Sequence, residues 1–392
     1  MDLSLTAEQE AFRDAARAFL EKEAVPHRQE WDDRESIDLG IIPGMAELGF
    51  FGLTIPEEYG GLGGDYVTYV LGMEELGRAD SALRGIVSVS NGLVGKSILG
   101  WGTEEQKREW LPRIATAEVL GCFGLTEPGV GSDAGNLRTR AVRDGDDYVI
   151  DGQKLFITNG TWAQVALIFA RTGGEGPRGI SAFLVPTDTP GFTAREVTGK
   201  LGLRGQATAE LFLDGVRVPA SAMLGGPADQ DGPNGEGQGF KVAMSSLDKG
   251  RVSVAAGCVG LVQACLETSV AYATSRTQFD RPIAAFQLVQ DMIADLSLDA
   301  DAARLLVWRC ADLLDRGEPV GLAASKAKLY ASEAAVRAAN LCIQVHGGSG
   351  YVSDYPAAKF LRDARVMTLY EGTSQIQKLI IGRAETGINA FT

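Results

Sequence analysis

The sequence has little of the residues that build metal centres, disulfide frameworks and nucleic-acid-binding surfaces. Its 392 residues include only five cysteines and two histidines, and no cysteine has CxxC spacing. This scarcity argues against a zinc site and against a disulfide framework. Lys and Arg number 37 against 51 Asp and Glu, which gives a net charge of −14. Because nucleic-acid affinity depends on neutralising phosphates, nucleic acid is not expected as a partner.

Long apolar runs and a targeting segment are also missing. No uninterrupted apolar run approaches the ~18 residues that a membrane span needs, and MDLSLTAEQEAF lacks the basic start and apolar stretch of a signal peptide. We therefore expect a cytoplasmic protein without a membrane partner. Composition is ordinary for a globular chain, with 45% hydrophobic and 22% charged residues. A chain of this length is expected to divide into two or three packed units, with Cys258 and Cys265 as small core residues.

Three segments differ in their residue pattern. Residues 1–118 have helical periodicity, and Thr6, three residues before Gln9, has the spacing of a capping box. Residues 119–225 contain short β-rich runs separated by Gly, Pro, Asp and Asn. Residues 226–392 return to helical periodicity.

The last segment opens with a breaker-rich linker, residues 225–239, and then shows apolar residues three and four apart from Phe286 to Leu314. Such sustained spacing predicts a helical bundle. The sequence thus predicts an α+β, mostly helical protein in the order helical domain, β domain, helical bundle.

Two stretches in the β segment carry residues that packing alone does not explain. GLTEPGVGSDAG (124–135) places Thr126 and Ser132 among turn-forming glycines, where backbone N–H groups and hydroxyls can meet a ligand. FITNG (156–160) places an aromatic ring and the hydroxyl of Thr158 at a strand end, where they could stack on and bond a flat ring. Ordinary turns are the alternative interpretation of both, a hairpin turn in the case of FITNG.

Further candidates lie in the helical segment. RTQFDRPIAAFQLVQ (276–290) passes from a loop into a helix, and its arginine is suited to bidentate phosphate contacts, although a solvated surface arginine is the simpler interpretation. QVHGGSGYVSDYP (344–356) and LYEGTSQIQ (369–377) follow. The latter holds a lone acid, Glu371, directly before a helix start, where a carboxylate ordinarily caps the helix or stabilises its dipole.

Together, in this order, these motifs closely resemble those of the acyl-CoA dehydrogenase family over essentially the whole chain, and TEPGxGSD and YEGTSxIQ are specific signatures of it. The resemblance implies an N-terminal helical domain, a middle β-barrel domain and a C-terminal four-helix bundle, with FAD held between the last two. Many relatives have Trp where this chain has Phe156, a ring that can still stack on the flavin.

The resemblance also implies the site residues. The flavin end would be contacted by Phe123, Leu125, Thr126, Gly131, Ser132, Phe156 and Thr158. The pyrophosphate and adenine half, usually of a neighbouring subunit's FAD, would be contacted by Arg276, Phe279, Gln287, Gln344, Gly347 and Gly348. Thr373 and Gln375 would also touch the cofactor. The substrate would be bordered by Ser132, Asp248, Arg251 and Gly372, although an ion pair within the bundle is the alternative for Asp248 and Arg251.

The implied reaction is FAD-dependent α,β-dehydrogenation of a saturated acyl thioester to the trans-2-enoyl thioester. Glu371 would remove the α-proton, flavin N5 would take the β-hydride, and the backbone N–H of Glu371 with a ribityl hydroxyl of FAD would stabilise the enolate-like oxygen. Desolvation suits a carboxylate to this task by raising its basicity. Some branched-chain relatives carry the base immediately before the arginine that corresponds to Arg251; here that residue is Gly250, which favours Glu371.

Several questions stay open at this stage. The thioester could be carried by CoA or by a carrier protein, and chain length and branching are unassigned. The resemblance implies an electron-transferring flavoprotein as acceptor and a homotetramer. Rival functions are a flavin-dependent monooxygenase of the same fold, which would not need Glu371, and a non-catalytic FAD-binding scaffold. A nicotinamide oxidoreductase is disfavoured because no GxGxxG opens a helix after a strand.

Overall fold

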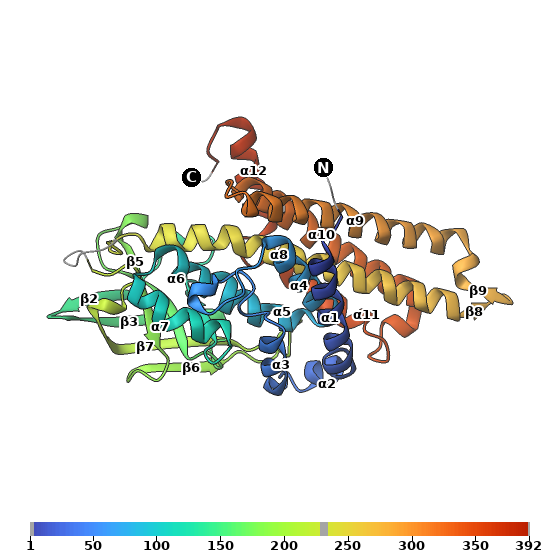
Figure 1. The fold of residues 1–392 in the computed structure, drawn as a ribbon. Coiled ribbons are helices and arrows are strands. Elements are labelled where there is room, and N and C mark those ends of the chain that lie inside the picture. Colours follow the sequence, from blue (N-terminus) through green and yellow to red (C-terminus); the bar gives the residue numbers. More distant parts are fainter. Residues whose placement is uncertain (1–3, 228–233, 391–392) are drawn as a thin grey trace.

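The computed structural model describes residues 4–227 and 234–390, which form a helical region, a sheet and a second helical region in chain order (Figure 1). Residues 228–233, in the middle of the predicted linker, lie outside the described residues. The sheet occupies one end of the molecule, and the longest helices run from beside it to the opposite end (Figure 1). The predicted order of helical, β and helical units is confirmed.

The first region consists of short helices joined by tight turns. Capping boxes begin two of them, because the Thr6 and Thr103 hydroxyls accept from the N–H groups of Gln9 and Gln106, whose side chains accept in return. The helices are α1 (Ala7–Glu23), α2 (Arg28–Asp33), α3 (Ile42–Glu47), α4 (Tyr66–Ala79), α5 (Ser81–Val87), α6 (Lys96–Trp101) and α7 (Glu104–Ala115). Between α5 and α6 the chain forms a π-helix, Ser88–Gly95, all of it buried. Such π-helical turns occur frequently at functional sites.

The middle region is a seven-stranded sheet with the pairing order β1-β4-β2-β3-β7-β6 and with β5 on β4. Its strands are β1 (Gly121–Gly124), β2 (Arg140–Asp144), β3 (Asp147–Thr158), β4 (Val165–Arg171), β5 (Ile180–Pro186), β6 (Phe192–Glu196) and β7 (Thr208–Pro219). Apolar residues cover both faces of β4: Leu167 packs with the N-terminal helices, and Ile168 packs inside the sheet domain. Burial on both faces explains the unbroken apolar sequence of this strand.

The last region is built on three long helices, α8 (Gly239–Ser275), α9 (Gln287–Asp315) and α10 (Gly321–His346), followed by α11 (Ala357–Met367) and α12 (Ser374–Thr386). A short hairpin, β8 (Thr277–Gln278) and β9 (Arg281–Pro282), joins α8 to α9 and projects beyond the bundle (Figure 1). The predicted apolar stripe on α9 is buried at Leu296, Ala300 and Ala303. By length and composition α8 could cross a membrane, but 67% of its most apolar window is buried inside the protein, as in the core helix of a soluble bundle.

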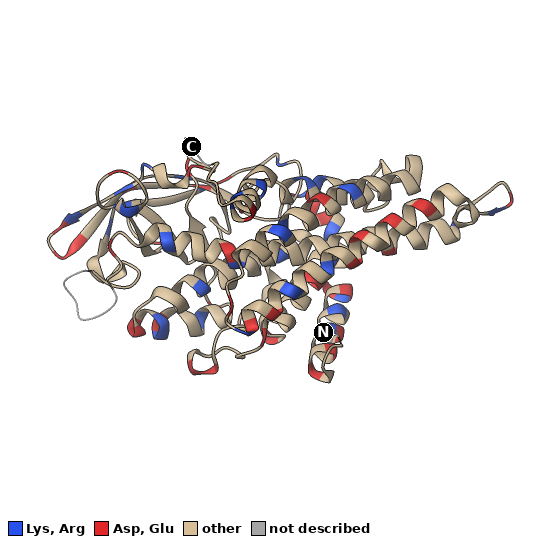
Figure 2. Ribbon diagram, turned by 90° about the horizontal axis from the view of Figure 1, so that it is seen from above, with Lys and Arg blue, Asp and Glu red and all other residues tan. Residues whose placement is uncertain are grey.

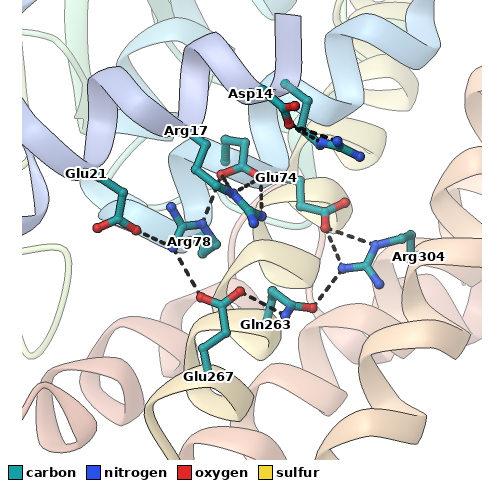
Figure 3. A network of polar contacts seen from close by, with 10 residues as sticks. Asp14, Arg17, Glu21, Glu74, Arg78, Gln263, Glu267 and Arg304 are labelled. Carbon is teal, nitrogen blue, oxygen red and sulfur yellow. Dashed lines mark hydrogen bonds and ion pairs between the residues drawn. The ribbon is translucent and has the colours of Figure 1, made fainter. Parts of the chain in front are cut away.

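A polar network fastens the N-terminal helices to the bundle (Figure 3). Glu75 on α4 accepts from Arg17 on α1 and from Arg78 on its own helix, and Arg78 continues to Glu267 on α8. A parallel branch joins Glu74 on α4 to Arg304 on α9. Because each buried charge here has a partner of opposite sign, the network holds α1, α4, α8 and α9 in fixed register.

Candidate active site

Glu371 lies in the turn between α11 and α12, where the backbone takes an unusual conformation. Its φ is 51° and that of Gly372 is 93°. A left-handed conformation at a residue with a side chain costs about 1–3 kcal/mol, so the surroundings must hold it. Lys328 Nζ donates to the Gly372 carbonyl at 2.8 Å, and Gln377 Nε2 donates to the Glu371 and Gly372 carbonyls at 3.2 and 3.0 Å. The cap of α12 is Thr373, so Glu371 does not serve as the helix cap.

The Glu371 carboxylate points at α8; the residue as a whole is partly exposed, but the Oε2 atom is buried. Its Oε2 atom has no hydrogen-bond partner among the described residues. A Cβ atom added at Gly250 would lie 2.1 Å from this oxygen, so the carboxylate occupies the space that the missing side chain leaves. Burial raises the pKa of Glu371 above its ordinary value, and the positive charges of Arg84, Lys328 and Arg251 partly offset that rise. A desolvated, unpartnered carboxylate of raised pKa is suited to accept a proton from carbon.

Asp248 and Arg251 flank Gly250 on the same helix and form the ion pair that the sequence offered as an alternative. Arg251 Nη1 lies 2.5 Å from Asp248 Oδ1. Arg251 Nε also donates to the Glu371 carbonyl at 3.4 Å, so the pair touches the turn that carries the carboxylate. The ion pair within the bundle is therefore present, and it lies against the turn that carries Glu371.

Replacement of Lys328 by Met is expected to move the pH dependence of the reaction. The variant removes a donor to the turn and a cation that lowers the pKa of Glu371. Because the base role that the sequence resemblance implies for Glu371 requires the ionised carboxylate, the rising limb of the rate should shift to higher pH. The rate on the plateau should fall about tenfold or more, since a hydrogen bond from a charged donor contributes about 1.5–3 kcal/mol.

The measurement is the anaerobic rate of flavin reduction by an acyl-CoA between pH 5 and 8. The upper limit is pH 8 because burial lowers the pKa of Lys328 itself to about 8. Lys326→Met on the same helix is the matched control, because Lys326 pairs with Glu385 on the surface. A Lys328→Met profile that coincides with the control would contradict a positioning role.

The two motifs of the sheet domain come together, as their assignment to one ligand requires. Leu155 N–H donates to the Thr126 carbonyl at 2.9 Å, and the Asn159 side chain donates to the Gly121 carbonyl at 3.1 Å. Phe123 and Leu125 are buried beside this junction, while Ser132 is exposed. No atom lies within 4 Å of a Cβ added at Gly131, so the loop borders open space. The Thr158 hydroxyl accepts from Gln206 Nε2 at 3.0 Å.

FITNG is not a hairpin turn. β3 pairs with β2 and β7 on either side, and β4, the next strand, pairs with β1 and β5. Phe156 has a φ of 59° and remains 63% exposed, although it lies on a strand of the core sheet. A strained backbone that keeps an aromatic ring out of the core suits a residue that stacks on a ligand.

A buried ion pair joins the loop 124–135 to strand β3. Lys154 Nζ lies 2.8 Å from Glu127 Oε1, and both side chains are at least 95% buried. Glu127 also accepts from the N–H groups of Arg138 and Thr139 at 2.6 and 2.9 Å. Burial opposes the charge of Glu127, but Lys154 and these donors hold its pKa below the ordinary range. The pair fixes the loop against β3.

Replacement of Lys154 by Met is expected to destabilise the fold by about 3 kcal/mol and to speed release of the flavin. The change leaves the Glu127 charge buried without its cation, and breaking a buried pair typically costs about 3–5 kcal/mol. Urea unfolding and the rate of flavin loss measure the two effects. The double variant Lys154→Met with Glu127→Gln should recover part of the stability, and equal stability of the single variant and the wild type would contradict the argument.

A second group of predicted residues lies at the far end of the bundle. Arg276 is the C-cap of α8, Gln287 begins α9, and α10 ends at Gly347. Tyr272 on α8 stacks on His346 of α10 at 4.3 Å between ring centroids, which places these helix ends side by side. Gln344, Gly347 and Gly348 are exposed there. Phe279, 87% exposed, lies in the projecting hairpin, whose tip carries an acidic and a basic residue (Figure 2).

The two groups are far apart within one chain. Arg276 follows Arg251, which touches the Glu371 turn, by 25 residues of the same helix. At 1.5 Å per residue that separation is about 38 Å. The structure therefore brings the predicted flavin-end residues together and the predicted adenine-end residues together, but not the two groups. Thr373 caps α12 beside Glu371, and Gln375 is exposed on that helix.

Sequence reasoning missed Arg84 and Lys328, two of the three buried cations that act on Glu371. A signal existed for the first, because Arg84 and Lys96 are the only charged residues between 81 and 101. Lys328 had no comparable signal, because Lys326 lies two residues away in the same helix and only the structure shows that Lys328 is fully buried. The described residues contain no group of three or more His, Cys, Asp or Glu side chains able to hold a metal ion.

Comparisons with known proteins match this arrangement. The family models described as acyl-CoA dehydrogenase N-terminal, middle and C-terminal domains match residues 6–118, 122–216 and 237–386. The probable acyl-CoA dehydrogenase YngJ of Bacillus subtilis (strain 168) is 44% identical over 385 residues, covering 98% of this chain and 99% of that protein.

Two solved structures are similarly close. Butyryl-CoA dehydrogenase from Megasphaera elsdenii aligns with a TM-score of 0.94 at 38% identity, covering 98% of this chain and 100% of that one. A glutaryl-CoA dehydrogenase from Mycobacterium smegmatis in complex with FADH2 aligns with a TM-score of 0.93 at 37% identity, covering 99% and 97%.

These comparisons place the protein among the flavin-dependent oxidoreductases. The chain belongs to the acyl-CoA dehydrogenase family, to which all three of its domains match.

Proposed function

We propose that this protein catalyses FAD-dependent α,β-dehydrogenation of a saturated acyl-CoA thioester, with Glu371 as the base that removes the α-proton. The observation that carries the proposal is the Glu371 carboxylate, held on a strained turn with one oxygen buried and unpartnered and with a raised pKa. An α-proton beside a thioester is weakly acidic, so its removal needs such a desolvated carboxylate. The backbone N–H of Glu371 would donate to the thioester oxygen as negative charge develops there.

FAD fits the residues that face the site. Phe156 offers an exposed ring, the loop at Gly131 borders open space, and Thr158 and Thr126 supply hydroxyls at the same junction. These residues and Phe123, Leu125 and Ser132 would hold the flavin, which supplies the redox capacity by accepting the hydride from Cβ. Thr373, at the head of α12, would contact it from the bundle side. FADH2 is bound in the related glutaryl-CoA dehydrogenase of known structure.

An oligomer, in our proposal a homotetramer, would complete each site. A single chain keeps the Glu371 turn, which Thr373 follows, about 38 Å along α8 from Arg276 at the adenine end, and this distance is longer than FAD. The adenine end would therefore be held by Arg276, Phe279 and Gln287 of a neighbouring subunit. Exposed apolar side chains on α9, such as Leu298 at 67% and Leu305 at 50%, agree with a face that packs against another chain.

The test is the visible spectrum of the purified protein during anaerobic addition of saturated acyl-CoAs from C4 to C16, branched ones included. Bleaching of the flavin band by at least one of them is expected. A flavin spectrum that none of them changes would refute an acyl-CoA substrate. The remaining alternatives would be a carrier-protein thioester as substrate or a monooxygenase activity, and rapid reaction of the reduced enzyme with air would identify the monooxygenase. Absence of flavin would overturn the proposal. Turnover with an electron-transferring flavoprotein, and not with NAD, is expected for the acceptor.

A further inference from the structure

Arg84 on α5 is a buried cation that forms no ion pair with a carboxylate of the described residues. It is 2% exposed, its Nη2 donates to the Tyr370 hydroxyl at 2.5 Å, and its buried Nε has no hydrogen-bond partner among the described residues. Arg78 and Arg251, each 7% exposed, are instead paired with Glu75 and Asp248. A guanidinium does not deprotonate in proteins, and an unpaired buried charge costs several kcal/mol. Arg84 therefore carries a positive charge in the core that no carboxylate of the described residues contacts as an ion pair, although the charge of Glu371 acts on it without contact.

Arg84 and Glu371 rest on the same face of α8, two turns apart. A Cβ added at Gly257 would lie 2.4 Å from Arg84 Cδ, just as one added at Gly250 would lie 2.1 Å from Glu371 Oε2. Residues seven apart lie on one helix face, and the separation along the axis is about 10.5 Å. The side chain of the proposed base thus packs against Gly250 and that of Arg84 against Gly257, at opposite ends of a two-turn stretch of α8.

The space between them is bordered by polar groups that lack partners. Ser253 lies between the two glycines on α8, and its buried hydroxyl has no well-formed hydrogen bond. The same is true of the buried Tyr69 hydroxyl on α4. Tyr69 interacts with Ser253, Arg84 and Glu371. The Ser88 hydroxyl is also buried and unpartnered. A Cβ atom added at Gly92 would lie 3.9 Å from the Ser88 hydroxyl and 2.9 Å from the Tyr69 hydroxyl. Buried polar groups are normally satisfied, so this many orphans in one place indicates a polar ligand.

We infer that Arg84 binds a carboxylate at the far end of the acyl chain, so that the preferred substrate is a dicarboxylyl thioester of about five carbons. The inference rests on the proposed function and names its substrate class. With the α-carbon at the Glu371 carboxylate, the 10.5 Å along α8 leaves room for Cβ and Cγ before a terminal carboxylate meets the guanidinium. The Tyr69 and Ser253 hydroxyls can donate to the same carboxylate. Relatives of known structure with butyryl-CoA and glutaryl-CoA as substrates leave the choice between classes open.

The competing role for Arg84 is that of a counter-ion which only keeps Glu371 ionised. Its charge does lower the pKa of that carboxyl. A counter-ion would affect all substrates alike, because each needs the same base. A binding residue would instead affect only substrates that carry the terminal carboxylate, so comparison of matched substrates separates the two roles.

The experiment uses the FAD-loaded enzyme and measures kcat/KM for flavin reduction by glutaryl-CoA and by its neutral monoamide, which has nearly the same shape. The wild-type ratio is expected to exceed about 100, because loss of a partner from a buried charge pair costs about 3–5 kcal/mol. In Arg84→Met the ratio should fall toward one, and Arg84→Lys should retain part of it. Arg78→Met, which removes an arginine that is also buried but is paired with Glu75, should leave the ratio at its wild-type value.

A wild-type ratio near one overturns the inference, whether or not any variant folds. So does an Arg84→Met variant that lowers kcat/KM for both thioesters equally, since that is the signature of the counter-ion. Reduction of the flavin by pentanoyl-CoA but not by glutaryl-CoA would refute the dicarboxylyl substrate while leaving the dehydrogenase intact. Failure of every thioester to reduce the flavin would instead refute the proposed function.

Discussion

Glu371→Gln is expected to slow flavin reduction by about 10³- to 10⁴-fold, near the upper end of what a general base contributes. The amide keeps the shape of the carboxylate but cannot accept the α-proton. Its surroundings offer no replacement, because the charged groups that act on Glu371 are the cations Arg84, Lys328 and Arg251. Stopped-flow bleaching of the flavin band, under anaerobic conditions with a saturating acyl-CoA, measures the loss.

Controls separate this loss from a loss of structure. Flavin content and the flavin spectrum should match those of the wild type, because the substitution leaves the fold and the sheet-domain motifs unchanged. Glu105→Gln, an exposed position on α7, should retain wild-type rates. Near-wild-type reduction by the Glu371→Gln protein would remove Glu371 from the role of base.

Stability should respond in the opposite direction to activity. The pKa of Glu371 is raised in the folded protein, so the ionised carboxylate costs stability above that pKa, and the cost disappears below the ordinary carboxyl pKa. At neutral pH, Glu371→Gln should therefore unfold at the same or at a higher urea concentration than the wild type. A residue that costs stability and is nevertheless held in place by Lys328 and Gln377 fits a functional role.

The order of the domains and the candidate base could be read from the sequence because both depend on local patterns. Capping boxes, the apolar stripe of α9 and the Gly-rich motifs are contiguous in the chain. The two motifs of the sheet domain could be assigned to one site only because both resemble motifs of the same family. Their contact in the structure is made by backbone hydrogen bonds, such as that from Leu155 to Thr126, which do not depend on the side chains in the sequence.

The electrostatics of the site could not be predicted in the same way. Arg84, Lys328 and Glu371 are separated by more than 40 residues from one another and meet only because α5, α10 and the turn before α12 pack around α8. Likewise, FITNG resembles a hairpin turn locally, but β3 is drawn to β7 by tertiary pairing. Long-range packing decides these points, and a single sequence does not specify it.

Gly250→Ala is expected to lower activity about 100-fold while leaving the fold intact. The new methyl group would lie 2.1 Å from Glu371 Oε2 and 2.9 Å from Leu93 Cδ2, so the carboxylate must move. A displacement of about 1 Å in a reacting group can cost on the order of 100-fold. The helix itself should gain up to about 1 kcal/mol from the replacement of an interior glycine by alanine. The measurements are the flavin-reduction rate and the urea midpoint.

Gly382→Ala provides the matched control, because it lies inside α12 and no atom is within 4 Å of its added Cβ. It should share any gain in helix stability and keep wild-type activity. If Gly250→Ala were as active as this control, the carboxylate would not need the space above Gly250. Loss of activity with an unchanged or higher unfolding midpoint is the expected signature of a displaced base.

The space between Gly250 and Glu371 should also accept a carboxylate that is carried by α8 instead of by the turn before α12. In the double variant Glu371→Gly with Gly250→Glu, a side chain on α8 would enter the volume that the original carboxylate leaves. Activity is expected to recover at least about tenfold over Glu371→Gly alone, although the base now approaches from a helix and not from a strained turn. Recovery should fade at low pH as the new carboxyl protonates. A double variant no more active than Glu371→Gly would mean that proton removal requires the turn geometry itself, with Lys328 and Gln377 holding it, and not merely a carboxylate at that point.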